Sequence, residues 1–137
     1  MVNALPKLPE NPDITDLLLR AAPEQPARLD ARSVDRLKDF GFTMDEIYRL
    51  IVPRRTLARR EERGELLTIA ESDSVRRVVR ICEIATGVFG QWERARGWLR
   101  DPCRALNGVV PVTLLESESG ARLVEDELLR IDHGMFF

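Results

Sequence analysis

The longest helical pattern covers residues 69–89, and it constrains the fold more than any other feature of the 137-residue chain. Its apolar residues recur three or four positions apart, which places them on one face of a helix. They are Val75, Val78, Val79, Cys82, Ala85, Val88 and Phe89. Thr68 and Glu71 form a capping box before this helix, and Gly87 and Gly90 are predicted to end it. We therefore expect one long central helix.

A shorter helix precedes it. Ser33 is predicted to be its N-cap, because a serine hydroxyl can accept a hydrogen bond from the first turn. This helix would bury Val34, Leu37 and Phe40 and would end at Gly41.

A helix, a short turn and a second helix are predicted next. Thr43 and Glu46 make a capping box at the start of a helix over residues 44–52. Pro53 suits the first turn of the next helix, and Gly64 stops it. This arrangement is typical of a helix-turn-helix, whose second helix lies against DNA.

The second of these helices is rich in arginine. Residues 49–63 hold six arginines and two glutamates, a net charge of +4, whereas residues 116–132 hold six acidic residues and two arginines, a net charge of −4. The candidates for contacts with DNA phosphates and bases are Arg54, Arg55, Arg59 and Arg60. The alternative is a helical scaffold with a solvated basic face, since Glu61 and Glu62 dilute the charge. DNA binding is therefore predicted as a secondary activity.

Both tryptophans lie in a helix predicted over residues 91–99. Trp92, Ala95 and Leu99 share one stripe of this helix, and Trp92 is expected in the core. Pro102 breaks the helix.

Short helical turns are expected over residues 102–106 and 111–115, on either side of a turn at Asn107 and Gly108. We expect the segment 101–111 to act as a hinge that holds the last helix away from the rest of the chain. That helix is predicted to begin near Ser117 and to end at Gly134. Its inward residues are predicted to be Ala121, Val124, Leu128 and Ile131, and its outward residues Glu118, Arg122, Glu125 and Glu127.

No alternating apolar pattern of strand length occurs in the sequence, so the predicted fold class is all-α. We divide the chain into an N-terminal arm or linker over residues 1–30, a helix-turn-helix-like helical bundle over 31–88 and a small helical C-terminal domain over 89–137. Within the arm, Asp13 is predicted to cap a helix over residues 14–22.

Residues suited to catalysis are scarce. The single histidine, His133, stands in the last turn of a predicted helix, where the helix dipole favours it without any chemical role. With one histidine, the sequence has neither a catalytic triad nor the Cys and His spacing of a metal site. We therefore predict no catalytic residue, no metal and no cofactor, and we expect the chain not to be an enzyme.

The first residues lack a long apolar run, so we predict neither a secretory signal nor a transmembrane segment. Two cysteines, Cys82 and Cys103, do not make a disulfide framework in a chain of this size, which favours a cytoplasmic location. A net charge of −2 gives no overall field that would attract nucleic acid or an anionic membrane.

The order of residues in the C-terminal third resembles the toxin-binding domain of the Xre/MbcA/ParS family of antitoxins. The matching residues are Trp98, Leu99, Pro102, Ala105, Leu106, Gly108, Pro111, Leu114, Leu115, Gly120, Val124, Leu128, Ile131 and Gly134. Residues 43–72 resemble the Xre-like helix-turn-helix part of the same family. Departures are modest: Cys103 stands where a polar residue is usual, and Pro111 lacks the usual threonine before it.

The resemblance implies a cognate partner, a toxin of the RES fold that consumes NAD⁺ by degrading it or by transferring its ADP-ribose to a protein. It further implies that the C-terminal domain blocks the toxin's NAD⁺ pocket, and that the chain forms a homodimer or a larger hetero-oligomer with the toxin. Operator DNA is the second expected partner, and a membrane is not expected.

Toxin contacts are expected from polar and aromatic residues among and beside the matching positions. These residues are Arg104, Asn107, Glu118, Arg122, Glu125, His133, Phe136 and Phe137. Met135 and the two phenylalanines would be an exposed apolar patch without a partner. The alternative function is a stand-alone helix-turn-helix transcriptional regulator that binds DNA through the arginines of residues 54–60.

Overall fold

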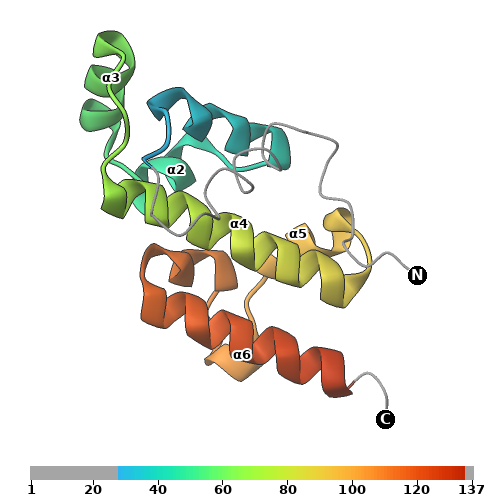
Figure 1. Ribbon diagram of the computed structural model, residues 1–137. Helices are drawn as coiled ribbons and strands as arrows, with labels where there is room; N and C mark the ends of the chain where they lie inside the picture. The colour runs from blue at the N-terminus through green and yellow to red at the C-terminus, as the bar shows by residue number, and fades with distance from the viewer. Residues whose placement is uncertain (1–27, 135–137) are drawn as a thin grey trace. The chain divides into compact units, whose positions relative to one another are not determined.

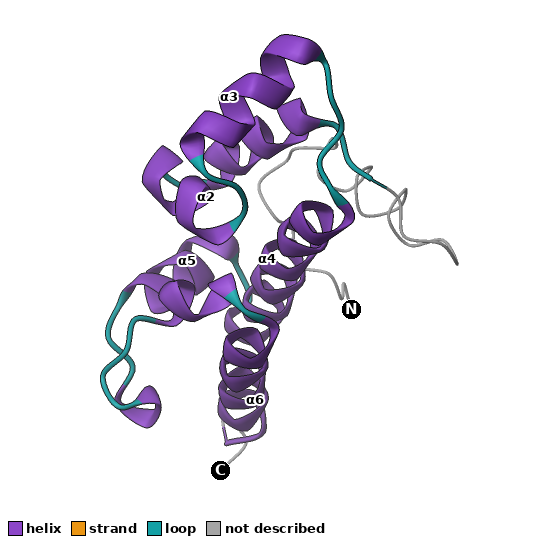
Figure 2. Cartoon of the chain, turned by 90° about the vertical axis from the view of Figure 1, so that its left-hand side faces the viewer, coloured by secondary structure: helices purple, strands orange, loops and turns teal. Residues whose placement is uncertain are grey.

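The computed structural model describes residues 28–134, and within this range the regular elements are all helices (Figures 1 and 2). The predicted all-α fold class is therefore confirmed. The elements, with η for a 3-10 helix, are η1 (Ala31–Phe40), α2 (Met44–Leu50), α3 (Arg54–Arg63), α4 (Ile69–Phe89), α5 (Trp92–Arg100), η2 (Arg104–Leu106), η3 (Pro111–Glu116) and α6 (Glu118–Gly134). The helix predicted over residues 14–22 lies outside the described residues.

The chain divides into two compact units, and the division falls inside α4, between Arg76 and Arg77. We call residues 28–76 the N-terminal unit and residues 77–134 the C-terminal unit. Each has large, fully buried side chains of its own, among them Leu37, Ile47 and Leu67 in the first and Leu99, Leu115 and Leu128 in the second. The domain boundary predicted at residue 88 stays a prediction.

The first helix, η1, begins earlier than predicted. A carboxylate oxygen of Asp30 accepts a hydrogen bond from the Arg32 amide at 2.8 Å, so Asp30 and not Ser33 is the N-cap. Ser33 is buried inside the first turn, and its hydroxyl donates to the Asp30 carbonyl. The prediction of Ser33 was wrong because aspartate is as good an N-cap as serine, and Asp30 stands directly before Ala31, the first buried residue of the helix. Gly41 ends η1 in the left-handed conformation, as predicted.

Both predicted capping boxes are confirmed. The Thr43 amide donates to Glu46 Oε1 at 2.9 Å, and the Glu46 amide donates to Thr43 Oγ1 at 3.1 Å. The Thr68 amide likewise donates to Glu71 Oε1 at 2.9 Å, and the Glu71 amide donates to Thr68 Oγ1 at 3.0 Å. These bonds satisfy amides that have no partner within the helix, so they define where α2 and α4 begin.

The connection between α2 and α3 is short, as a helix-turn-helix requires. Ile51 is the C-cap of α2 and Pro53 is the N-cap of α3, one position before the first turn in which we predicted it. Gly64 ends α3 with a φ of 65°. Further along the chain, Gly90, with a φ of 86°, follows the end of α4 as predicted, but the prediction for Gly87 was wrong, because this residue lies inside the helix.

In the C-terminal unit, α6 packs against η3 and η2. Its residues Ala121, Val124 and Leu128 are completely buried. The expectation that a hinge holds this helix away from the rest of the chain was therefore wrong. The segment between α5 and α6 instead folds into η2 and η3, whose Val112 and Leu115 help to bury the apolar face of α6.

One outward residue predicted for α6 is buried. The side chain of Glu127 is covered because its position borders the buried face, between Val124 and Leu128. Its carboxylate accepts hydrogen bonds from Arg130 Nε at 3.0 Å and Nη2 at 2.7 Å. This local pair compensates the charge of a carboxylate that is taken out of water.

Candidate functional site

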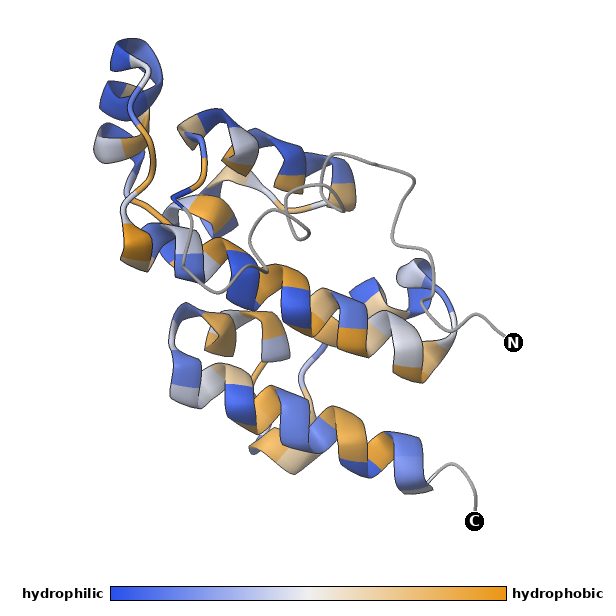
Figure 3. Cartoon of the chain, viewed as in Figure 1, coloured by the Kyte–Doolittle hydropathy of each residue, from blue (hydrophilic) through white to orange (hydrophobic). Residues whose placement is uncertain are grey.

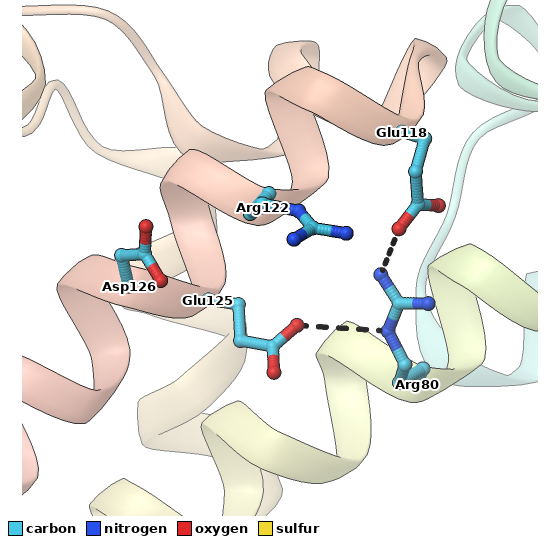
Figure 4. A pocket seen from close by; sticks show the side chains of 5 residues that line it. All are labelled: Arg80, Glu118, Arg122, Glu125 and Asp126. Atoms are coloured by element: carbon cyan, nitrogen blue, oxygen red, sulfur yellow. Dashed lines mark hydrogen bonds and ion pairs between the residues drawn. The ribbon is translucent and has the colours of Figure 1, made fainter.

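An open recess of about 300 Å³ lies on the C-terminal unit between α4 and α6. Figure 4 shows Arg80 from α4 and four residues of α6 around it, namely Glu118, Arg122, Glu125 and Asp126. Three of these residues, Glu118, Arg122 and Glu125, were predicted to contact the toxin. Residues three or four positions apart share a helix face, so α6 brings the three side chains together.

The two glutamates of the recess are engaged by an arginine of α4. Arg80 Nη2 lies 3.0 Å from Glu118 Oε2, and Arg80 Nε lies 3.8 Å from Glu125 Oε1 (Figure 4). Arg77, one turn earlier, lies 3.8 Å from Glu118 Oε1 through its Nη1. These ion pairs fix the outward face of α6 relative to the second half of α4.

Arg77 also stabilises the junction between η3 and α6. Its Nε donates to the Leu115 carbonyl at 3.0 Å, and its Nη2 donates to the Glu116 carbonyl at 3.3 Å. These carbonyls stand at the C-terminal end of η3, where no following turn is available to bond them. Neither Arg77 nor Arg80 was among the predicted site residues. The sequence placed both arginines in an amphipathic helix, but it gave no indication of their hydrogen-bond and ion-pair partners, which lie 38 or more positions away.

The remaining predicted toxin contacts lie elsewhere on the C-terminal unit. Arg104 and Asn107 are exposed in and after η2, and Asn107 adopts a left-handed conformation with a φ of 60°. His133 is exposed in the last turn of α6, about 22 Å along the helix axis from Glu118. Phe136 and Phe137 lie outside the described residues.

Two exposed leucines on α6 were missed by sequence reasoning. The exposed fraction is 54% for Leu123 and 44% for Leu129. Figure 3 shows hydrophobic and hydrophilic colours alternating along this helix. Their exposure could have been predicted from the sequence, because both residues are apolar and neither falls on the inward stripe of Ala121, Val124 and Leu128.

In the N-terminal unit, the outward side of α3 is basic. Arg54, Arg55 and Arg59 are exposed, and the last two lie one helical turn apart on the same face. Leu57 is the buried residue of this helix, and most of α3 is hydrophilic in Figure 3. The positive charge therefore lies on the second helix of the helix-turn-helix, where contacts with DNA phosphates would be made.

Arg60 differs from the other three arginines. Its Nε lies 3.0 Å from Glu71 Oε1 and its Nη2 donates to Glu71 Oε2 at 3.2 Å. Glu65 Oε1 is a further 3.5 Å contact of the same guanidinium. Arg60 thus joins α3 to the first turn of α4, and its guanidinium is engaged within the unit.

Glu61 of α3 is directed towards η1. Partial burial raises the pKa of the Glu61 carboxyl, and the nearby carboxylate of Asp35 raises it further. This glutamate is half-buried, so it offsets the exposed arginines of α3 less than the sequence implied.

No helix among residues 28–134 is long and apolar enough to cross a membrane. Within the same range, no group of three or more His, Cys, Asp or Glu side chains is placed to hold a metal ion.

Comparison with known proteins bears on both units. Residues 85–134 match the family model described as the antitoxin Xre/MbcA/ParS C-terminal toxin-binding domain, and residues 20–80 match that of the antitoxin Xre-like helix-turn-helix domain. An "Antitoxin Xre" of Photorhabdus laumondii is 32% identical over 105 residues, which cover 74% of this chain and 71% of that protein. The chain belongs to the Xre/MbcA/ParS antitoxin family. The predictions of this family and of a non-enzymatic protein are thereby confirmed.

Two further members of the family are similar over shorter lengths. An "Antitoxin Xre" of Pseudomonas putida is 39% identical over 84 residues, covering 61% of this chain and 53% of that protein. An "Antitoxin Xre" of Yersinia enterocolitica is 36% identical over 86 residues, covering 62% of this chain and 58% of that protein. The chain therefore spans little more than half the length of these two relatives.

Proposed function

We propose that this chain is an antitoxin that neutralises a cognate RES-fold toxin by covering the toxin's NAD⁺ pocket with its C-terminal unit. The observation that carries the proposal is the match of residues 85–134 to a toxin-binding domain. The toxin would consume NAD⁺, by degrading it or by transferring its ADP-ribose to a protein. Neutralisation would then need steric cover alone, and no catalytic group on this chain.

The outward face of α6 supports this proposal physically. It presents exposed apolar side chains, such as Leu129, among charged residues that would form a polar rim. Its buried face packs within the unit, and the ion pairs of Arg80 hold its orientation. A preformed helix loses little conformational freedom on binding, so an interface of about 800 Å² on each partner can bind tightly.

Co-expression with the protein encoded beside this chain tests the proposal. Truncation after Ser117 would remove the buried residues of α6 and unfold the unit, so a surface substitution is the sharper variant. We expect Leu129→Glu to abolish co-purification, growth rescue and maintenance of cellular NAD⁺. Leu66→Glu is the matched control, because both leucines are 44% exposed but Leu66 lies in the N-terminal unit.

Two results would contradict the proposal. If the wild-type chain neither binds the neighbouring protein nor restores growth, it is not that protein's antitoxin. If the purified complex consumes NAD⁺ as fast as the free toxin, the NAD⁺ pocket is open and occlusion is wrong. Equal effects of the two leucine substitutions would exclude α6 as the contact surface.

A second function, binding of operator DNA by the N-terminal unit, is favoured by the exposed arginines of α3. Variants should spare Arg60, since its loss would disturb the contact between α3 and α4. We expect the double substitution Arg55→Gln and Arg59→Gln to weaken binding to the chain's own promoter. The slope of log affinity against log salt should become shallower by about 2, because each phosphate contact contributes about 1.

The control for this experiment is Arg94→Gln with Arg96→Gln, two exposed arginines of α5 in the C-terminal unit. It removes the same net charge and should leave the salt slope unchanged. If both double variants reduce promoter binding equally, the effect is that of total charge, and α3 is not the DNA-binding helix. Promoter binding that persists without any toxin partner would favour the stand-alone regulator.

A further inference from the structure

Two charged residues of the recess, Arg122 and Asp126, are left available by the ion pairs around them. Arg80 is engaged by Glu118 at 3.0 Å and by Glu125 at 3.8 Å. Arg122 and Asp126 are exposed, and neither side chain forms a hydrogen bond or ion pair with another residue in the range 28–134. The recess therefore offers one unpaired cation and one unpaired anion, spaced one helical turn apart on α6.

We propose that Arg122 and Asp126 determine which toxin this chain accepts, by pairing with a carboxylate and a basic side chain spaced to match them on the toxin. This inference rests on the proposed function. It separates the residues of the recess into two roles: Glu118 and Glu125 hold α6 to α4 through Arg80, whereas Arg122 and Asp126 meet the partner. Asp126 was not among the predicted contacts.

The chemistry of the two residues suits selection between partners. A guanidinium can donate two parallel hydrogen bonds to one carboxylate, which makes Arg122 selective for the position of an acidic group. Asp126 repels an acidic group one turn away and attracts a basic one. A toxin with the two charges in the wrong order would bring like charges together, which is costly where water is partly excluded.

The geometry supports fixed rather than adaptable pairing. Both residues stand on α6, whose opposite face includes the fully buried Val124 and Leu128. Arg80 anchors Glu118 and Glu125 on the same outward side of the helix (Figure 4). The backbone positions of the two charges are thus set before binding, so a mismatched toxin cannot be accommodated by movement of the helix.

A charge swap tests this inference. The double variant Arg122→Asp with Asp126→Arg keeps the composition and net charge, so long-range attraction to the toxin is unchanged. It also places the acid before the base along the helix, which is the more favourable order for helix stability. The probe is the purified protein encoded beside this chain, and affinity is measured by titration calorimetry with circular dichroism to verify folding.

We expect the swapped chain to bind the toxin at least about tenfold more weakly than the wild type. The matched control is the swap Asp45→Arg with Arg49→Asp, two exposed residues one helical turn apart on α2, which should change affinity less than about twofold. The neutral variants Arg122→Gln and Asp126→Asn provide a second measurement, and each should weaken binding by about threefold or more.

The outcomes separate this inference from the proposed function. If the wild type binds and the swapped and neutral variants bind equally well, Arg122 and Asp126 do not select the toxin, and the antitoxin proposal stands. If the wild type does not bind the neighbouring protein at all, both proposals are overturned. Loss of binding in the α6 swap alone, with an unchanged helical spectrum, supports the inference.

Discussion

Each unit of this protein uses an arginine to join two helices, but the two arginines are buried to different degrees. Arg60 in the N-terminal unit and its partner Glu71 have side chains that are 13% and 15% exposed. Arg80 in the C-terminal unit and its partner Glu118 are 42% and 52% exposed. Removing one partner of a pair shielded from water costs more stability than removing one partner of an exposed pair, because the remaining charge is poorly solvated, whereas solvent and salt screen an exposed charge. Arg60 is therefore structural, whereas Arg80 orients a surface.

The units also differ in how they use glycine: a Cβ added to Gly64 of the N-terminal unit would meet nothing within 4 Å, whereas Gly120 of the C-terminal unit has no room for one. Gly120 therefore gives the largest expected effect. A Cβ added to Gly120 would lie 2.1 Å from the Leu114 carbonyl oxygen, where η3 and α6 approach each other. We expect Gly120→Ala to lower the free energy of unfolding of the C-terminal unit by about 3 kcal/mol or more, because backbone must move. Urea unfolding followed by tryptophan fluorescence measures this, since both tryptophans lie in α5.

Gly97→Ala is the matched control, because Gly97 lies inside α5 and a Cβ added there would meet nothing within 4 Å. It should be neutral or should stabilise α5 by up to about 1 kcal/mol, since alanine favours the helix. Comparable destabilisation by both substitutions would mean that the contact between η3 and α6 is loose enough to admit a methyl group.

The ion pair of Arg60 gives the next largest effect. We expect Arg60→Met to lower the free energy of unfolding of the N-terminal unit by about 2 kcal/mol, since it removes a charged hydrogen bond and an ion pair to Glu71. Arg59→Met, one position earlier but exposed, should change it by less than about 0.5 kcal/mol. Thermal unfolding monitored by circular dichroism distinguishes the two. An equal decrease in the free energy of unfolding for both variants would show that Arg60 is as solvated as Arg59.

The corresponding substitution in the C-terminal unit should be milder. We expect Arg80→Met to lower the free energy of unfolding of the C-terminal unit by less than about 1 kcal/mol, because the ion pairs with Glu118 and Glu125 are largely exposed. The same variant should nevertheless weaken toxin binding, since α6, which carries Arg122 and Asp126, then loses the ion pairs through Glu118 and Glu125 that hold it to α4. If its stability cost exceeds that of Arg60→Met, the comparison between the two arginines fails.

The smallest effect concerns Glu83 of α4, a half-buried carboxylate. Burial raises the pKa of the Glu83 carboxyl above its ordinary value. Between the unfolded and folded pKa values the folded state holds a proton that the unfolded state has lost, so stability falls as pH rises through this window. Glu83→Gln should remove that fall and stabilise the unit at neutral pH by less than about 1 kcal/mol, given solvent screening.

Urea unfolding at acidic and neutral pH measures the effect of Glu83→Gln. Glu93→Gln, a substitution at an exposed position of α5, is the control and should leave the pH dependence unchanged. If Glu83→Gln lowers stability at neutral pH, the carboxylate has a favourable contact that outweighs its desolvation.

The sequence by itself determined the helical elements and where most of them begin and end. Capping boxes such as Thr43–Glu46 and stop residues such as Gly41 act over a few residues, so their patterns can be seen without a fold. The order of Gly, Pro and Trp in the C-terminal third was likewise sufficient to indicate the family, which comparison confirms.

Only the tertiary structure decided which charged residues are engaged within the protein and which are available to a partner. Arg59 and Arg60 are adjacent and chemically identical, yet Arg60 reaches Glu71, eleven residues along the chain, because the short connection after α3 brings the first turn of α4 close to the last turn of α3. Arg80 similarly meets Glu118, 38 residues away, and leaves Arg122 without a partner in the described range. Such pairings depend on how the helices pack, so they cannot be inferred from residue type and spacing in the sequence.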